Sequence, residues 1–151
     1  MPPLHLHIAL TLHLLIEFPA SLSFLLQPRA QLPGATPEAV LVLRNLGGLL
    51  MATNLVCLVL LHFLSKAATS DSSPLVEHLT GMVCVALGTY HVWPAHRAWV
   101  RMRKRNRGEG VVGQSEKRIL GGPVVHFWVH LVCLGAMMGS GGAVLMRERE
   151  V

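Results

Sequence analysis

The chain has 151 residues, of which 52% are hydrophobic and 14% are charged, and its mean hydropathy is +0.49. This composition is typical of a membrane protein and excludes an ordinary water-soluble domain. A net charge of +5 would suit nucleic acid in a soluble chain, but here the cations gather beside an apolar run. That position is typical of the cytoplasmic side of membrane helices. We therefore expect contact with the lipid bilayer and no binding of nucleic acid.

Four apolar runs follow one another, each close to the roughly 20 residues that a helix needs to cross a hydrocarbon core. We predict membrane spans at residues 4–26, 46–64, 75–93 and 124–146. The fold class is therefore expected to be all-α, an integral membrane four-helix bundle. No run of residues remains for a soluble domain, so 1–151 is expected to form a single membrane domain.

Helix-start patterns precede the second and third runs. Thr36 offers a capping hydroxyl, and Pro37 follows it at the first helical position. This pattern predicts a helix that begins well before the second span. Ser73 and Pro74 repeat the pattern ahead of the third run.

A basic segment at 97–118 separates the third run from the fourth and contains eight of the thirteen Lys and Arg residues. They are Arg97, Arg101, Arg103, Lys104, Arg105, Arg107, Lys117 and Arg118. We predict a basic cytoplasmic loop here. With four spans, this side of the membrane carries ten Lys and Arg against three on the other, which places both termini away from the cytoplasm.

Two pairs of small residues predict close helix packing. Gly48 and Ala52 lie four residues apart in the second run, as do Gly135 and Gly139 in the fourth. Small side chains at this spacing let a second helix approach closely. The expected partner at either pair is another membrane protein or a second copy of the chain.

Polar side chains inside the runs are the candidates for chemistry. Glu17 is an acid within the first run, where a charge costs on the order of 2.5–3.5 kcal/mol at the bilayer centre. His13 precedes it by one helical turn, and His130 lies at a comparable depth in the fourth run. We predict Glu17, His13 and His130 as catalytic, proton-handling candidates. The alternative is an internal hydrogen bond that only satisfies the buried acid.

A second candidate site is a group of histidines near the cytoplasmic interface. His126 and His130 form an H-x-x-x-H box, which resembles one of the histidine boxes of membrane desaturases and hydroxylases. With His91 and His96 they give four imidazoles suited to Zn, Cu or Fe. The H-x-x-H-H box of those enzymes is missing from the sequence. The alternative is a set of interfacial side chains that holds no metal, and no cofactor is assigned.

The three cysteines each lie inside an apolar run, with no C-x-x-C spacing. They are Cys57, Cys84 and Cys133. We interpret them as small apolar residues of the bundle rather than a disulfide framework.

Two segments, 28–33 and 43–50, resemble small four-helix membrane proteins of filamentous fungi and, loosely, the DoxX-like group. This resemblance implies a compact four-span bundle in the endoplasmic reticulum or another endomembrane, of a kind that accompanies lipid or secondary-metabolite pathways. The expected function is a non-catalytic or accessory role in handling a lipophilic metabolite or assembling a membrane complex. The alternative is a small membrane enzyme acting on a lipid-soluble substrate through its His and Glu groups, and a proton or small-solute carrier is a third class.

Overall fold

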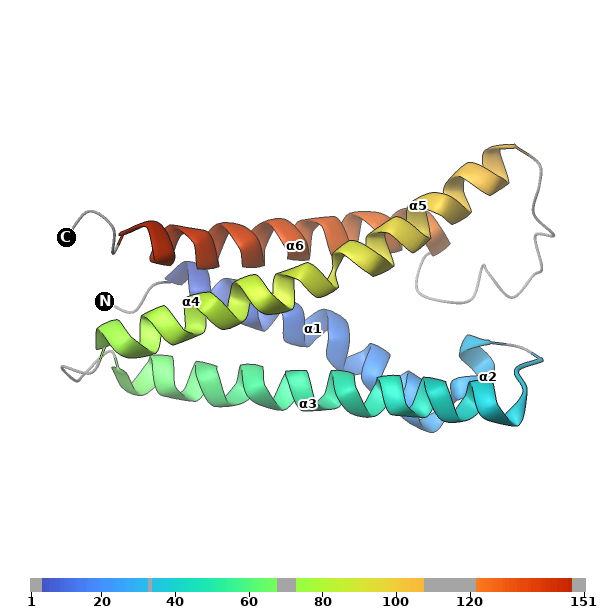
Figure 1. Ribbon diagram of the computed structural model, residues 1–151, viewed down its shortest axis with the longest axis horizontal. Helices are drawn as coiled ribbons and strands as arrows, with labels where there is room; N and C mark the ends of the chain where they lie inside the picture. Colours follow the sequence, from blue (N-terminus) through green and yellow to red (C-terminus); the bar gives the residue numbers. More distant parts are fainter. Residues whose placement is uncertain (1–3, 33, 68–72, 108–121, 148–151) are drawn as a thin grey trace. The chain divides into compact units, whose positions relative to one another are not determined.

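The computed structural model describes residues 4–32, 34–67, 73–107 and 122–147. Every regular element in these ranges is an α-helix, which confirms the predicted all-α class. The helices are α1 (Leu4–Leu26), α2 (Pro28–Gln31), α3 (Pro37–Ala67), α4 (Ser73–Tyr90), α5 (Val92–Asn106) and α6 (Gly122–Arg147) (Figure 1). The chain divides into two units, Met1–Thr80 and Gly81–Val151, which are described separately.

Among the described residues, three helices are long and apolar enough to cross a membrane: α1, α3 and α6. They contain the predicted spans at 4–26, 46–64 and 124–146. The predicted span at 75–93 is helical too, but it is divided between α4 and α5. Glu77 and His78 lower the hydropathy of the first half of α4, and this helix is not among the three.

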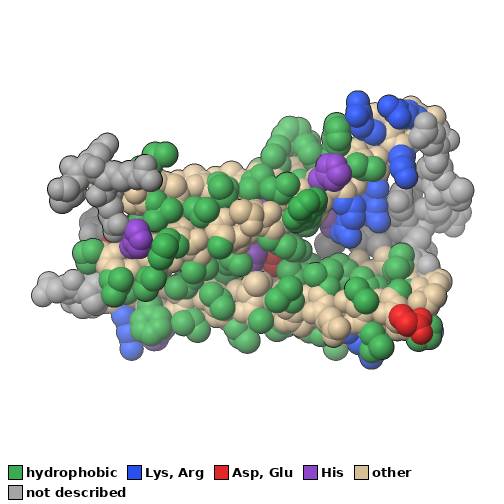
Figure 2. Space-filling model, in the orientation of Figure 1, with side chains coloured by type: hydrophobic (Ala, Val, Ile, Leu, Met, Phe, Trp, Pro, Cys, Tyr) green, Lys and Arg blue, Asp and Glu red, His purple; other side chains and the backbone are tan. Residues whose placement is uncertain are grey.

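The outer faces of these helices carry large apolar side chains. Leu15 on α1 is 70% exposed, Leu49 on α3 is 64% exposed and Trp128 on α6 is 58% exposed. Figure 2 shows apolar side chains spread over the visible faces of the helices. Exposed apolar surface of this extent is unfavourable in water and favourable in contact with lipid. The exposure pattern therefore agrees with the membrane composition of the chain.

In the unit Met1–Thr80, α1 packs along α3. The buried positions of α3 recur at steps of three, four or seven residues, the spacing that keeps one stripe of a helix against a neighbour. They are Gly47, Leu50, Asn54, Cys57, Leu64 and Ala67. The buried residues of α1 include three polar side chains, His13, Glu17 and Ser21.

The connection between α1 and α3 follows the predicted helix-start pattern. The Thr36 hydroxyl accepts a hydrogen bond from the Ala39 N–H at 3.3 Å, and α3 begins at Pro37. The short helix α2 lies against α1, where the Gln31 amide donates a hydrogen bond to the Ser23 hydroxyl. The start of α3 well before residue 46 is thereby confirmed.

In the unit Gly81–Val151, the last part of α4 and the first part of α5 pack along α6. Their buried residues recur at steps of three and four: Gly81, Cys84, Gly88, His91, Ala95 and Ala98. The buried stripe of α6 has similar spacing: His130, Cys133, Met137, Gly141 and Val144. Most members of the first stripe are small, so the helix axes come close together. A Cβ added at Gly141 would lie 2.5 Å from the Gly81 carbonyl oxygen.

A break at His91 separates α4 from α5. Pro94 explains it, because proline has no N–H to donate to the Tyr90 carbonyl and its ring displaces that carbonyl. The chain bridges the break with the His91 N–H to Gly88 carbonyl bond of 3.0 Å and the Ala95 N–H to His91 carbonyl bond of 3.2 Å. After the break, α5 packs against α6.

The first part of the segment predicted as a basic loop is helical. Residues 97–106 belong to α5, since Arg and Lys are strong helix formers. Arg97, Arg101, Arg103 and Lys104 are exposed, and the Arg103 guanidinium lies 4.6 Å from the centre of the Trp99 ring. Figure 2 shows Lys and Arg side chains gathered over α5. Lys117 and Arg118 lie outside the described residues.

Candidate functional site

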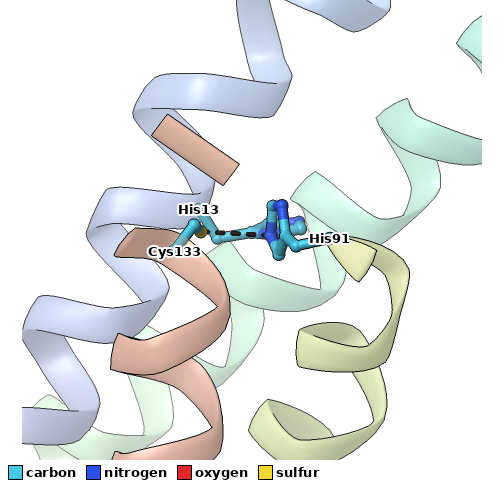
Figure 3. Close-up of side chains that lie close together, drawn as sticks. All are labelled: His13, His91 and Cys133. Carbon is cyan, nitrogen blue, oxygen red and sulfur yellow. Dashed lines mark hydrogen bonds between the residues drawn. The ribbon is translucent and has the colours of Figure 1, made fainter. Parts of the chain in front are cut away.

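Three side chains of the unit Gly81–Val151 form a buried hydrogen-bonded chain. The Nδ1 atoms of His91 and His130 are 2.9 Å apart. The Cys133 Sγ lies 3.1 Å from the other ring nitrogen of His91, Nε2. Figure 3 shows the second contact as a dashed line between Cys133 on α6 and His91 at the junction of α4 and α5. His91 and Cys133 are fully buried, and His130 is 7% exposed.

Local sequence explains how these groups meet. His130 and Cys133 are three residues apart on α6, so both side chains project from the stripe that faces α4 and α5. His91 occupies the matching stripe three residues after Gly88. Because Pro94 ends α4 at Tyr90, His91 lies at a bend rather than within a straight helix. The imidazole therefore reaches α6 with a contact on each of its nitrogens.

These contacts limit which ring nitrogens of His91 and His130 can carry a proton. Since two Nδ1 atoms face each other, one must donate and the other must accept. When His91 Nδ1 carries the proton, its unprotonated Nε2 can accept the Cys133 thiol proton. A thiol, an imidazole that receives its proton and a second group that orients the imidazole are the parts of a nucleophile–base pair. The arrangement can thus move a proton from sulfur towards His130.

The other two histidines of the predicted metal set are placed differently. The ring of His126 stacks on that of His130 at a centroid distance of 6.1 Å and is half-buried. His96 is exposed and lies beside Trp99, with ring centroids 6.1 Å apart. The structure therefore brings His91, His126 and His130 into one neighbourhood, whereas His96 contacts Trp99 instead.

The predicted acid–base pair lies in the unit Met1–Thr80. His13 and Glu17 are one turn apart on the same buried stripe of α1. Asn54, near the middle of α3, is 1% exposed, and neither polar atom of its side chain has a hydrogen-bond partner among the described residues. A buried amide without partners costs about 1–3 kcal/mol. These three residues are buried polar groups on helices whose exposed faces carry large apolar side chains.

The sequence interpretation of Cys133 missed its surroundings. An apolar-run cysteine with no C-x-x-C spacing carries no sign of reactivity by itself. The available sign was its distance of three residues from His130, which places both on one helical face. The partner His91 is 42 residues earlier, and only the fold shows that contact.

No protein-family model, curated protein or solved structure matches the chain.

Proposed function

We propose that the chain is a multi-pass membrane protein with a non-catalytic, accessory role in assembling a membrane complex. The observation that carries this proposal is the outer face of α6. Gly135, Gly139 and Gly142 recur there at steps of four and three, and a Cβ added at any of them would have no described atom within 4 Å. Glycines at this spacing form a shallow groove that suits a second membrane helix.

The groove is distinct from the packing inside the unit. The buried stripe of α6, which includes Gly141, already packs against α4. Gly135 and Gly139 point the other way and are exposed. Exposed neighbours such as Val132 and Met138 would add dispersion contacts around a helix seated there. In its simplest form the partner is a second copy of the chain, with another membrane protein as the other form.

Self-association in lipid vesicles tests this role. The double variant Gly135→Leu/Gly139→Leu fills the groove, and we expect it to weaken association at least about tenfold, equivalent to about 1.4 kcal/mol. Resonance energy transfer between labelled copies measures the change. Thr11→Leu is the control, because Thr11 is exposed on α1, a helix that carries neither of the predicted small-residue pairs. Copies that associate equally well with the groove filled would contradict the proposed contact.

The wider setting belongs to the same proposal. α4 would serve as the fourth span of a four-helix bundle, with the basic residues of α5 at the cytoplasmic surface. The resemblance of segments 28–33 and 43–50 to fungal and DoxX-like membrane proteins supports placement in the endoplasmic reticulum or another endomembrane. Handling of a lipophilic metabolite, as in a secondary-metabolite pathway, is the process that this setting favours.

A second candidate function is a small membrane enzyme that acts on a lipid-soluble substrate. The specific observation in its favour is the buried contact between His91 and His130. Ionisable groups are costly to bury inside a membrane protein, and those that are found there commonly have a function. His13 and Glu17 would supply further acid–base groups, and the histidines suit a transition metal.

A metal form of this enzyme has a direct test. It predicts about one transition-metal ion per chain in detergent-purified protein, measured by elemental mass spectrometry. The ion should be lost in His130→Ala and kept in His96→Ala, because His96 lies beside Trp99 and is exposed. Purified protein with no metal would contradict the metal form and leave proton transfer as the chemistry of these residues.

A further inference from the structure

We propose that Cys133 is a nucleophile that adds to lipid-soluble Michael acceptors, such as enones or quinones, with His91 as its base and His130 as the group that positions His91. The inference goes beyond both functions above, since neither gives Cys133 a role. It rests on the contacts of Cys133 with His91 and of His91 with His130.

A comparison within the unit shows why Cys133 differs from an ordinary buried thiol. Cys84 on α4 and Cys133 on α6 are both fully buried. Cys84 makes no hydrogen bond with any described residue, whereas the Cys133 sulfur lies 3.1 Å from an imidazole nitrogen. The thiolate, not the thiol, attacks electrophiles, so a base in contact with sulfur determines reactivity. Cys84 therefore provides an internal reference for Cys133.

The location of the thiol indicates the class of substrate. Cys133 lies about two residues before the middle of α6, a depth of about 3 Å from the helix midpoint at 1.5 Å per residue. An α6 that crosses the bilayer would hold the sulfur deep in the hydrocarbon region, where an apolar electrophile is concentrated. Addition to a carbon–carbon double bond also releases no leaving group, so nothing charged has to leave a buried site.

The reaction balances with the groups present. The Cys133 thiol proton passes to His91 Nε2 while the His91 Nδ1 proton passes to His130. The thiolate then forms a bond to the β-carbon of the acceptor, and the π electron pair moves onto the enolate. The proton returns through His91 to the α-carbon. The S–H bond and the C=C π bond are lost, an S–C bond and a C–H bond are formed, and no oxidant or reductant is consumed.

The test uses the full chain in phosphatidylcholine vesicles and N-cyclohexylmaleimide, a neutral apolar Michael acceptor. Peptide mass spectrometry follows the adducts of Cys133 and Cys84 over time. We expect Cys133 to react at least about a hundredfold faster, the smaller end of the range for a positioned base. Equal rates at the two cysteines, or no reaction at either, would overturn the proposal.

Two variants separate activation by the base from mere access. His91→Gln keeps a polar side chain but removes the base, and the Cys133 rate should fall to within about threefold of the Cys84 rate. His130→Gln leaves the base but removes its orienting partner, so the Cys133 rate should fall less than in His91→Gln and the pH profile of that rate should shift.

An unchanged Cys133 rate in His91→Gln contradicts the proposal. Should that variant fail to fold, the comparison of Cys133 with Cys84 in the unsubstituted chain still decides. Failure here leaves the assembly role untouched, because labelling and self-association are measured independently.

Discussion

Replacing Gly141 by Ala is expected to destabilise the unit Gly81–Val151 by about 2–3 kcal/mol, the upper part of the roughly 1–3 kcal/mol that an extra methyl group costs in a packed site. The new Cβ would lie 2.5 Å from the Gly81 carbonyl oxygen, 2.8 Å from Val85 Cγ2 and 3.1 Å from the Val85 nitrogen. Two of these atoms belong to the backbone of α4, so the clash is relieved only if the helices separate. Separation would remove dispersion contacts along both buried stripes.

The neighbouring glycine supplies a matched control. A Cβ at Gly142 has no described atom within 4 Å, so Gly142→Ala should be neutral or stabilising, because Ala is the better helix former by about 1 kcal/mol. All three tryptophans, Trp93, Trp99 and Trp128, lie within this unit. Tryptophan fluorescence during a denaturant titration in detergent therefore reports the unfolding of this part alone. Equal midpoints for the two variants would show that α4 and α6 do not cross at Gly141.

Replacing Gly47 by Ala is expected to have a comparable effect on the unit Met1–Thr80. The added Cβ would lie 2.9 Å from both the nitrogen and Cγ of Leu25 and 3.0 Å from Phe24 Cβ. Leu25 can rotate its side chain, but its backbone nitrogen cannot move without displacing the end of α1. We expect a loss of about 2 kcal/mol, concentrated where α1 meets α3.

Gly48→Ala is the control for this second prediction, because no described atom lies within 4 Å of its added Cβ. This unit contains no tryptophan, so hydrogen exchange measured by mass spectrometry is the better readout. Amides of α1 near Leu25 should exchange faster in Gly47→Ala and at the original rate in Gly48→Ala. Identical exchange in the two variants would contradict the close approach of α1 and α3.

Local sequence patterns predicted the helices well. The apolar run 4–26 coincides with α1, and Thr36 with Pro37 correctly located the start of α3. These features depend on neighbours in the chain: hydropathy over about 20 residues, a capping hydroxyl and a proline at the first helical position. The break at His91 was also within reach, because Pro94 disfavours a continuous helix through this point.

The rotation of each helix about its axis could not be predicted in the same way. Gly47 and Gly48 are adjacent, yet one is buried and the other exposed. In a membrane helix both faces are apolar, so hydropathy does not show which one turns inward. Hydropathy likewise did not show that the predicted pair Gly135 and Gly139 faces outward, while Gly141 makes the close contact. Whether the outward pairs bind a partner stays a prediction.

The sequence predicted only some of the residues of the candidate site. His130 was singled out as a polar group inside an apolar run, and the H-x-x-x-H spacing added His126. His91 was proposed together with His96 as part of a set of four imidazoles, and Cys133 was interpreted as a packing residue. Their contact spans 42 positions of the chain, and no spacing rule covers that distance. The assignment of Glu17, His13 and the histidine set to catalysis or metal binding stays a prediction.

The bend at Pro94 also determines what a relative with this site would look like. Pro94 touches none of the reactive atoms; it positions the His91 ring by ending α4 at Tyr90 and so bending the backbone at His91. The pattern to search for therefore contains more than the reactive groups. It is H-x-x-P, read from His91 to Pro94, followed in a later apolar helix by H-x-x-C, read from His130 to Cys133. A chain that kept both histidines and the cysteine but had alanine at the proline position would lack the feature that aims the first ring.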